Sequence, residues 1–564
     1  MDSKKIIFAV IILSAIFLRL YALGRGDTLT DEVLISFRAV GMLDFDEAED
    51  QTTPLEWLDP VRPWWTHLSF HDHPPLAFLA QYLSMNILGE TTTGFRFPSV
   101  LAGLGTLVLT WFIGKELGGK RIGLFAAGAL ALTTNHVYIS RIGLQESLVI
   151  FWITATLFTY LRVVRSHSIS KFIYLGICLG MAFLSKYTTF LLVPIMGAHL
   201  VWSHRDILRK HWRQFLLSLG IGVLIFFPVL IYNAGLYFTY GHFDFQFSYL
   251  AGQHPPQWGV TPGKEVGTLA SRIMTFIPIL VSVNSPLFLL IALAGGVLMS
   301  VRWRQFLLIN LAFLFYALFI IVILGPSHRF LSMLTPFFAV ASGVWLAWFD
   351  EYMRGGWRRV FVLTICFASV FEVLYAYNSQ IKYYPVGSPV TAYAKGARSE
   401  NFNWGYNELG EYIERELEGK RPAKVFTMRY KFLEDVHEGA LRRQELQRLT
   451  PYSAVVVYDY NIYNVAQLWL LDRLNIYHAW PVVSIPQYVA FMRAQGYTNP
   501  LNTGFENYYF IIATDAVPQK GLERRTNDAA LFEAELRRLE VMPLPITNKR
   551  GEEVFRVYTV RPRS

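Results

Sequence analysis

Side chains suited to acid–base and phosphate chemistry stand at a few well-separated positions in this sequence. They are Asp31, Glu32, His71, Asp72, His73, Arg96, Arg141, Glu146, Lys186, His328 and Arg329. A carboxylate can remove a proton from an attacking hydroxyl. Lysine and arginine side chains can bind a phosphate and stabilise it as it leaves. Together these residue types supply what group transfer from a phosphate needs.

Several of these residues also have an ordinary structural interpretation. Arg96 and Arg141, considered singly, are typical of cations that end apolar segments and extend to lipid headgroups. Asp31–Glu32 is equally typical of a helix end or a loop. The acidic stretch Asp44 to Asp50 is typical of a solvated loop.

A divalent metal site is a second hypothesis for one of these segments. His71, Asp72 and His73 provide two ligands at best from one extended segment. A zinc, manganese or magnesium site would therefore need a third ligand, from Glu32, His242 or His254. Without it, the three residues would simply order a loop.

The composition indicates a membrane protein. Hydrophobic residues make up 53% of the 564 residues and charged residues 16%, against about 25% charged in ordinary soluble domains. The net charge of +9 comes from short basic clusters between apolar runs, and no zinc-finger or RNA-binding signature accompanies it. We therefore expect a lipid bilayer, and no nucleic acid, as partner. Cys178 and Cys366 lie in apolar runs and are typical of small buried hydrophobic residues.

The apolar segments predict about 11 transmembrane helices. They fall near 5–24, 97–114, 122–139, 146–163, 172–184, 187–202, 214–231, 275–299, 305–323, 330–349 and 358–378. The first is longer than the apolar region of an ordinary signal peptide and no cleavage site follows it, so we expect it to be retained. The apolar stretch 76–88 is too short to span and is expected to be interfacial or re-entrant.

Basic clusters between these segments predict the orientation. Lys4–Lys5 precede the first apolar segment, and a basic cluster follows every second segment after it. If all of these clusters are cytoplasmic, the positive-inside rule is satisfied. The N-terminus is then cytoplasmic. Residues 25–96, the loop 232–272 and everything after 379 are then extracytoplasmic, as are the short turns that carry Glu146, Lys186 and Arg329. The candidate residues thus collect at one face, and ionisable groups at membrane depth usually mark a substrate site. This favours group transfer from a lipid phosphate on the outer face.

Two domains are expected. Residues 1–378 form the transmembrane core, with candidate residues in the outer loop 25–96 and a second outer loop at 232–272. Residues 379–564 carry strand-like runs at 454–458 and 508–513 and amphipathic stretches at 409–417 and 529–539. They predict an extracytoplasmic α/β domain.

The motifs of the core resemble those of the C-type membrane glycosyltransferases. The similar elements are Thr30–Asp31–Glu32, His71–Asp72–His73–Pro74–Pro75–Leu76, Phe95–Arg96–Phe97–Pro98–Ser99, Arg141 with Glu146–Ser147–Leu148, Phe183–Leu184–Ser185–Lys186 with Pro194, and His328–Arg329–Phe330–Leu331 with Pro336. Within that class, the protein O-mannosyltransferases and the lipid A aminoarabinose transferases are the most similar. The resemblance covers residues 1–378 and implies a core of about 11 spans.

The resemblance implies a role for each candidate residue. Asp31 corresponds to the catalytic base, and Glu32 to its neighbour at the acceptor site. Asp72 and His73 match the element where relatives place a metal-binding acid and a phosphate-contacting cation. The expected donor-phosphate ligands are Arg96, Lys186, Arg329 and His73, and the expected supporting residues of the acidic and acceptor site are Glu146, Arg141 and Asp72. Where the aminoarabinose transferases carry lysine before Pro–Pro, this chain has His73, as the mannosyltransferases do.

The predicted activity is inverting transfer of a sugar from a polyprenyl-phosphate donor to an acceptor hydroxyl on a protein, lipid or glycan. No cofactor is required, because the lipid-linked sugar carries its own activation; a divalent metal is the alternative. The rival hypotheses are a lipid or sugar transporter or flippase and a non-catalytic membrane scaffold. No internal repeat of the kind many transporters show is visible, and a scaffold leaves the ionisable cluster unexplained.

Overall fold

The computed structural model describes residues 3–45, 62–254, 267–387, 393–395, 402–521 and 525–561. Of the acidic stretch Asp44 to Asp50, residues 46–50 lie outside the described residues. The chain forms two compact units. One, here called the helical unit, comprises Met1–Gly24 and Trp65–Arg398; the other, here called the α/β unit, comprises Arg25–Trp64 and Ser399–Ser564. Residues 25–64, expected in an outer loop of the core, thus group with the C-terminal residues.

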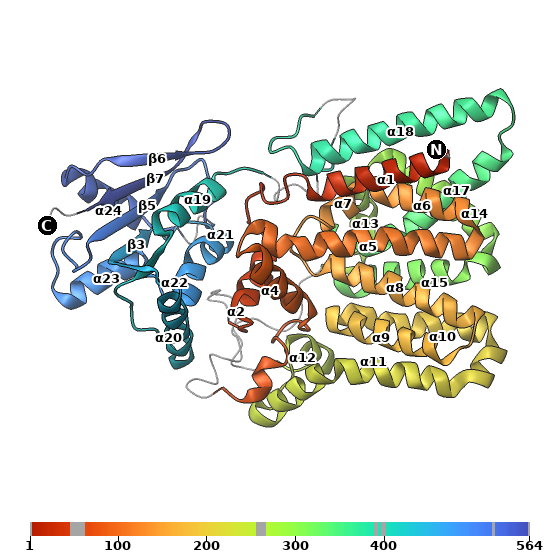
Figure 1. The fold of residues 1–564 in the computed structure, drawn as a ribbon, viewed down its shortest axis with the longest axis horizontal. Coiled ribbons are helices and arrows are strands. Elements are labelled where there is room, and N and C mark those ends of the chain that lie inside the picture. Colours follow the sequence, from red (N-terminus) through yellow and green to blue (C-terminus); the bar gives the residue numbers. More distant parts are fainter. Residues whose placement is uncertain are drawn as a thin grey trace. The chain divides into compact units, whose positions relative to one another are not determined.

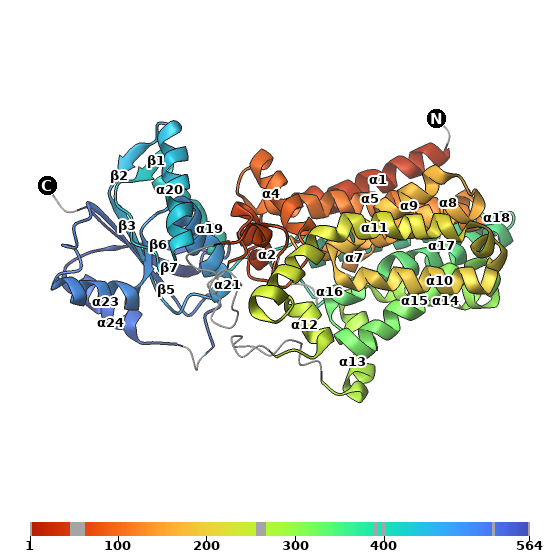
Figure 2. The same ribbon diagram turned by 90° about the horizontal axis from the view of Figure 1, so that it is seen from below.

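The helical unit is a bundle of long apolar helices (Figure 1). Its first half contains α1 (Ser3–Leu20), η1 (Trp64–His67, whose first residue belongs to the α/β unit), α4 (Leu76–Leu88), α5 (Thr92–Gly118), α6 (Lys120–Leu132), α7 (Thr134–Ile139), α8 (Glu146–Arg165), α9 (Ile169–Ser185), η2 (Tyr187–Leu191) and α10 (Leu192–Ser203). Its second half contains α11 (Arg205–Tyr240), α12 (Phe245–Ala251), α13 (Leu269–Val283), α14 (Pro286–Val301), α15 (Trp303–Phe319), the π-helical η3 (Ile320–Leu324), α16 (His328–Leu331), η4 (Ser332–Leu334), α17 (Thr335–Tyr352) and α18 (Gly356–Gln380). Figure 2 shows α4, α12 and α16 at the same end of the bundle.

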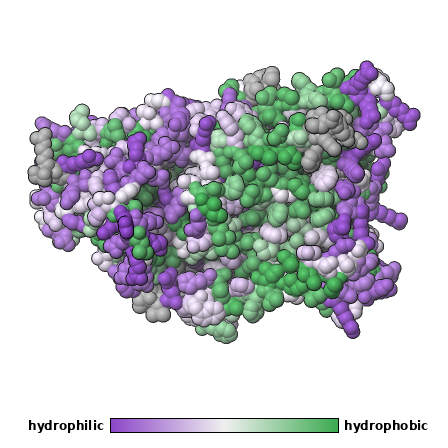
Figure 3. All heavy atoms as spheres, in the orientation of Figure 1, coloured by the Kyte–Doolittle hydropathy of each residue, from purple (hydrophilic) through white to green (hydrophobic). Residues whose placement is uncertain are grey.

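The helical unit is membrane-embedded and multi-pass. Within the described residues, six helices are long and apolar enough to cross a membrane: those at 92–118, 146–165, 205–240, 303–324, 328–352 and 356–380. Shorter apolar helices occupy the predicted spans near 5–24, 172–184 and 187–202. Two segments predicted as single spans are each divided between two helices: 122–139 between α6 and α7, and 275–299 between α13 and α14. Figure 3 shows hydrophobic residues spread over most of the visible face of this unit. The exact number of crossings stays a prediction, because several predicted spans are short or broken.

Small residues let the helices approach closely. A Cβ atom added to Gly295 of α14 would lie 1.8 Å from the carbonyl oxygen of Ala341 on α17. Gly114 of α5 and Gly123 of α6 likewise meet backbone to backbone. Such contacts favour helix association where no water is present to drive hydrophobic burial.

The α/β unit contains a five-stranded sheet of order β4-β3-β5-β7-β6. The strands are β3 (Ala454–Tyr458), β4 (Val482–Ser484), β5 (Asn507–Ala513), β6 (Pro543–Thr547) and β7 (Glu553–Val560); β1 (Lys420–Pro422) and β2 (Thr450–Tyr452) form a separate parallel pair. β3 pairs in parallel with β4 and β5, whereas β7 runs antiparallel to β5 and β6. The helices are α2 (Glu32–Gly41), α19 (Tyr406–Leu417), α20 (Lys431–Leu446), α21 (Asn464–Gln467), η6 (Leu468–Asp472), α22 (Arg473–His478), α23 (Ile485–Gln495) and α24 (Asp528–Arg538). The predicted α/β fold of the tail is confirmed.

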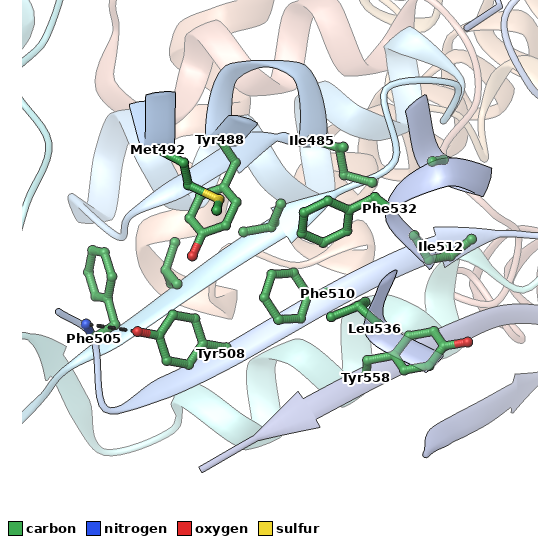
Figure 4. Packing of buried hydrophobic residues seen from close by; sticks show 13 residues of the cluster. Ile485, Tyr488, Met492, Phe505, Tyr508, Phe510, Ile512, Phe532, Leu536 and Tyr558 are labelled. Atoms are coloured by element: carbon green, nitrogen blue, oxygen red, sulfur yellow. Dashed lines mark hydrogen bonds between the residues drawn. The ribbon is translucent and has the colours of Figure 1, made fainter. Parts of the chain in front are cut away.

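Helices α23 and α24 cover one face of this sheet. Tyr488 of α23 and Phe532 of α24 pack against Phe510 of β5 (Figure 4). Tyr508 lies on the same face of β5, two residues away, because side chains alternate along a strand. Its hydroxyl accepts a hydrogen bond from the backbone of Phe505 (Figure 4). This core gives the α/β unit its own buried centre.

Candidate functional site

A buried ion pair lies in the helical unit where α8 begins and α9 ends. Lys186 Nζ is 2.7 Å from Glu146 Oε1. The Glu146 side chain is 2% exposed and that of Lys186 14%. Arg329 is within electrostatic reach of Glu146, and both Lys186 and Arg329 lie over the ring of Phe330, at 5.2 and 5.1 Å. One carboxylate and two cations from three separate segments thus lie close together, and their expected roles at the donor and acceptor stay predictions.

Local breaks in the helices place these side chains. Lys186 has an extended backbone (φ −171°, ψ 144°), which ends α9 and starts η2. The Ser327 side chain caps α16 by accepting a hydrogen bond from the Phe330 backbone. The π-helical η3 precedes that cap, and π-helical turns inside helices are frequent at functional sites. Cationic side chains are therefore presented at helix ends, and Glu146 occupies the first turn of α8.

The His71–Asp72–His73 segment is ordered by its neighbours. His73 Nδ1 lies 2.8 Å from Asp72 Oδ2. The His71 carbonyl accepts a hydrogen bond of 2.7 Å from the Phe245 backbone. Among the described residues, no group of three or more histidine, cysteine or acidic side chains could hold a metal ion. Among the described residues, the structure thus brings no third protein ligand to this segment. The metal site stays a prediction.

Arg96 and Arg141 are placed at the carboxyl end of α1. Arg141 donates hydrogen bonds to the carbonyls of Leu18, Arg19, Tyr21 and Ala22, at 2.9 to 3.2 Å. Arg96 donates to the carbonyl of Leu23 at 2.9 Å. Cations are favourable at a helix C-terminus, where backbone carbonyls lack partners.

Both guanidinium groups are almost fully buried. Burial, and then the charge of Arg96, lower the pKa of Arg141 to about 9, so Arg141 stays cationic near neutral pH. The geometry thus gives both arginines a structural role. The expected phosphate contact of Arg96 and the supporting role of Arg141 stay predictions.

Asp31 and Glu32 begin α2 in the α/β unit. Asp31 occupies the N-cap position but its side chain makes no capping hydrogen bond, and it is exposed. Glu32 is fully buried. The alternative in which Asp31 simply caps a helix is therefore weakened, because its carboxylate does not perform that function here.

A network that the sequence did not reveal holds this segment in place. Asp27 accepts hydrogen bonds from the backbones of Trp404, Gly405 and Asn407, at 2.5, 3.1 and 2.9 Å, at the start of α19. Burial raises the pKa of Asp27 to about 6, against the lowering effect of these bonds. Asp27 precedes Asp31 by four residues and so fixes the entry into α2.

The α2 helix is also held by its far end. Arg38 and Asp44 form a buried ion pair of 3.3 Å. Phe37 packs on Tyr477, with ring centres 5.1 Å apart. A Cβ atom at Gly41 would lie 2.4 Å from the ring of Tyr477. Asp31 and Glu32 therefore stand on a helix with defined packing within the α/β unit.

Comparisons with known proteins agree with this architecture. The structure resembles that of ArnT from Cupriavidus metallidurans in the apo state, with a TM-score of 0.53, 12% sequence identity and 98% of each chain covered. The form of that protein bound to undecaprenyl phosphate gives a TM-score of 0.50 at 11% identity, covering 99% of this chain and 98% of that one. The chain thus shares the fold of this ArnT structure, and the likeness extends over the C-terminal residues, in which the sequence had shown no motif.

The sequence comparisons agree with the predicted resemblance. Residues 72–232 match the family described as dolichyl-phosphate-mannose-protein mannosyltransferase. The polyprenol-phosphate-mannose–protein mannosyltransferase of Corynebacterium glutamicum is 30% identical over 140 residues, which are 23% of this chain and 26% of that protein. The undecaprenyl phosphate-α-4-amino-4-deoxy-L-arabinose arabinosyl transferase of Pectobacterium atrosepticum is 24% identical over 238 residues, 39% of this chain and 42% of that protein. The chain thus matches between a quarter and a half of the length of these relatives.

Proposed function

We propose that this protein is a membrane glycosyltransferase that moves a sugar from a polyprenyl-phosphate donor to an acceptor hydroxyl. The observation that carries the proposal is the buried Glu146–Lys186 pair with Arg329 beside it, where cations outnumber the carboxylate. Such a site can hold an anionic phosphate. The names of both relatives, which specify polyprenol- or undecaprenyl-phosphate sugars, support this donor class.

The reaction is an inverting displacement. The acceptor oxygen forms a bond to the anomeric carbon while the bond from that carbon to the phosphate oxygen breaks. Asp31 receives the acceptor proton, and the polyprenyl phosphate leaves with the electron pair of the broken bond. Glu32 orients the acceptor, and Lys186 and Arg329 stabilise the phosphate charge. Neither sugar nor acceptor is specified by these residues, so a hexose and a pentose are both candidates.

Reconstitution of the purified protein with defined donors tests this proposal. Nanodiscs containing the protein are supplied with polyprenyl-phosphate mannose or with undecaprenyl-phosphate 4-amino-4-deoxy-arabinose, together with envelope extract as acceptor. Mass spectrometry should find free polyprenyl phosphate and a glycosylated product with one of the donors. If neither donor binds or is consumed, the proposed function is wrong.

A further inference from the structure

Asp244 joins segments of the helical unit that are far apart in the sequence. Its Oδ2 accepts hydrogen bonds from the Tyr187 hydroxyl at 2.5 Å and from Asn233 Nδ2 at 3.0 Å. Asn233 Oδ1 in turn accepts from the Asp244 backbone at 2.9 Å. Oδ1 accepts from the backbones of Gln246 and Phe247 and so caps α12. Asp244 itself is fully buried.

These bonds reach two parts of the candidate site through adjacent residues. Tyr187 follows Lys186 directly in the turn between α9 and η2. Phe245 follows Asp244 and donates its backbone hydrogen bond to the carbonyl of His71. The loop that starts α12 therefore ties together the turn that presents Lys186 and the segment that presents His73.

The ring of Tyr187 is fixed independently of its hydroxyl. It packs against Phe247 at 4.9 Å, Phe190 at 5.9 Å and Phe226 at 6.1 Å between ring centres. Loss of the hydroxyl alone would leave this packing intact. The ring contact with Phe247 would remain, so the hydrogen bond to Asp244 is the part of the link between the Lys186 turn and the α12 segment that depends on the hydroxyl.

We propose that Asp244 is a positioning residue for the donor phosphate. Through Tyr187 it fixes the turn of Lys186, and through Phe245 it fixes the segment of His73, so that both side chains face one phosphate. This inference rests on the proposed function, because it assumes that these side chains bind a polyprenyl phosphate. Asp244 touches neither the phosphate nor the sugar and acts only through the segments it holds.

Tyr187→Phe is the sharpest variant, since it removes one hydroxyl and keeps the ring. Tyr160→Phe is the matched control: the Tyr160 hydroxyl makes a buried hydrogen bond of 2.8 Å to His199, between α8 and α10. Asp244→Asn is a second variant that weakens the same contact from the other side. Each full-length protein is placed in nanodiscs, and binding of undecaprenyl phosphate is titrated while the melting temperature is measured on the same sample.

We expect Tyr187→Phe and Asp244→Asn to weaken undecaprenyl phosphate binding about tenfold, because the loss of a buried hydrogen bond to a charged group has an effect of about that size. The double variant should bind no more weakly than the weaker single variant, because both lose one contact. Tyr160→Phe should lower the melting temperature comparably but keep binding within about twofold of the parent. With saturating donor, Tyr187→Phe should recover most of its turnover, so the loss should reside in KM.

Two results would overturn the inference. One is parental binding by both Tyr187→Phe and Asp244→Asn; the other is equal weakening by Tyr160→Phe, which would reduce the effect to general stability. Either result leaves the proposed function standing if the parent protein binds undecaprenyl phosphate and transfers sugar. A parent protein that does neither would instead refute the proposed function.

Discussion

Lys186 Nζ lies 2.7 Å from Glu146 Oε1, and the pair joins the end of α9 to the start of α8, two helices that pack against each other. Breaking a buried pair by removing one partner costs about 3–5 kcal/mol, because the other charge is left unpaired. Lys186→Met should therefore lower the stability of the protein by that amount. Adding Glu146→Leu should recover most of it while donor binding remains lost. Thermal unfolding and undecaprenyl phosphate titration on both variants check this. Recovery of binding in the double variant would contradict a role for Lys186 at the phosphate.

Replacing Arg329 tests its role in phosphate binding. Its guanidinium lies over the Phe330 ring near the Glu146–Lys186 pair. Arg329→Ala should weaken undecaprenyl phosphate binding at least tenfold, because a charge-assisted contact to phosphate is lost. Arg304→Ala, at an exposed position in a predicted cytoplasmic cluster, is the control and should bind as the parent does. Equal binding by the Arg329 variant and the parent would remove Arg329 from the donor site.

The raised pKa of Asp27 predicts that the stability of the α/β unit depends on pH. Its folded pKa of about 6 lies above the ordinary value of 3.8. The folded state thus binds the proton more tightly than the unfolded state, so the contribution of Asp27 to stability is greatest below pH 4. It falls as the pH rises to about 6 and is constant above that. An asparagine side chain at this position cannot ionise, so Asp27→Asn should lack this component.

Hydrogen exchange of residues 402–417, measured between pH 4 and 7 and corrected for intrinsic rates, checks the prediction. The difference in protection between parent and Asp27→Asn should change between pH 4 and 6 and level off above. A difference that is independent of pH over this window would show that Asp27 keeps its ordinary pKa.

The basic clusters predict the orientation of the protein. Reporter fusions after Gly118, Ser168 and Arg209 should read cytoplasmic, and a fusion after Gln253 should read external. The charges that set this pattern lie in short loops, where the positive-inside rule is strongest. An external signal at Ser168 would refute the arrangement of the spans.

The long helices of the bundle could be predicted because they leave apolar runs in the sequence, but the break between α13 and α14 could not, because the run 275–299 is apolar through most of its length. The residues that hold the site could not. The hydrogen bond between Tyr187 and Asp244 joins positions 57 residues apart, and that between Asp27 and Trp404 joins positions 377 apart. Such contacts leave no periodic pattern, because they depend on where the helices end. The hydrogen bonds of Arg141 to the backbone carbonyls of α1 could not be predicted for the same reason.

The segment around Asp31 shows a further limit. Its acidic pair could be recognised by type and spacing, but its grouping with Ser399–Ser564 could not. The contacts that fix α2, such as Phe37 on Tyr477, come from a part of the chain whose motifs resembled no known family.

Sugar transfer by Asp31→Asn shows directly whether Asp31 is the catalytic base. The substitution keeps the shape of the side chain but removes the base, and a general base typically contributes about a hundredfold to ten-thousandfold in rate. Turnover should fall by that amount while the melting temperature and undecaprenyl phosphate binding stay parental; Glu32→Gln should cost less. Transfer and melting are measured on one preparation of each protein. Near-parental transfer by Asp31→Asn would show that Asp31 is not the base and would leave Glu32 or Asp72 as the next candidate.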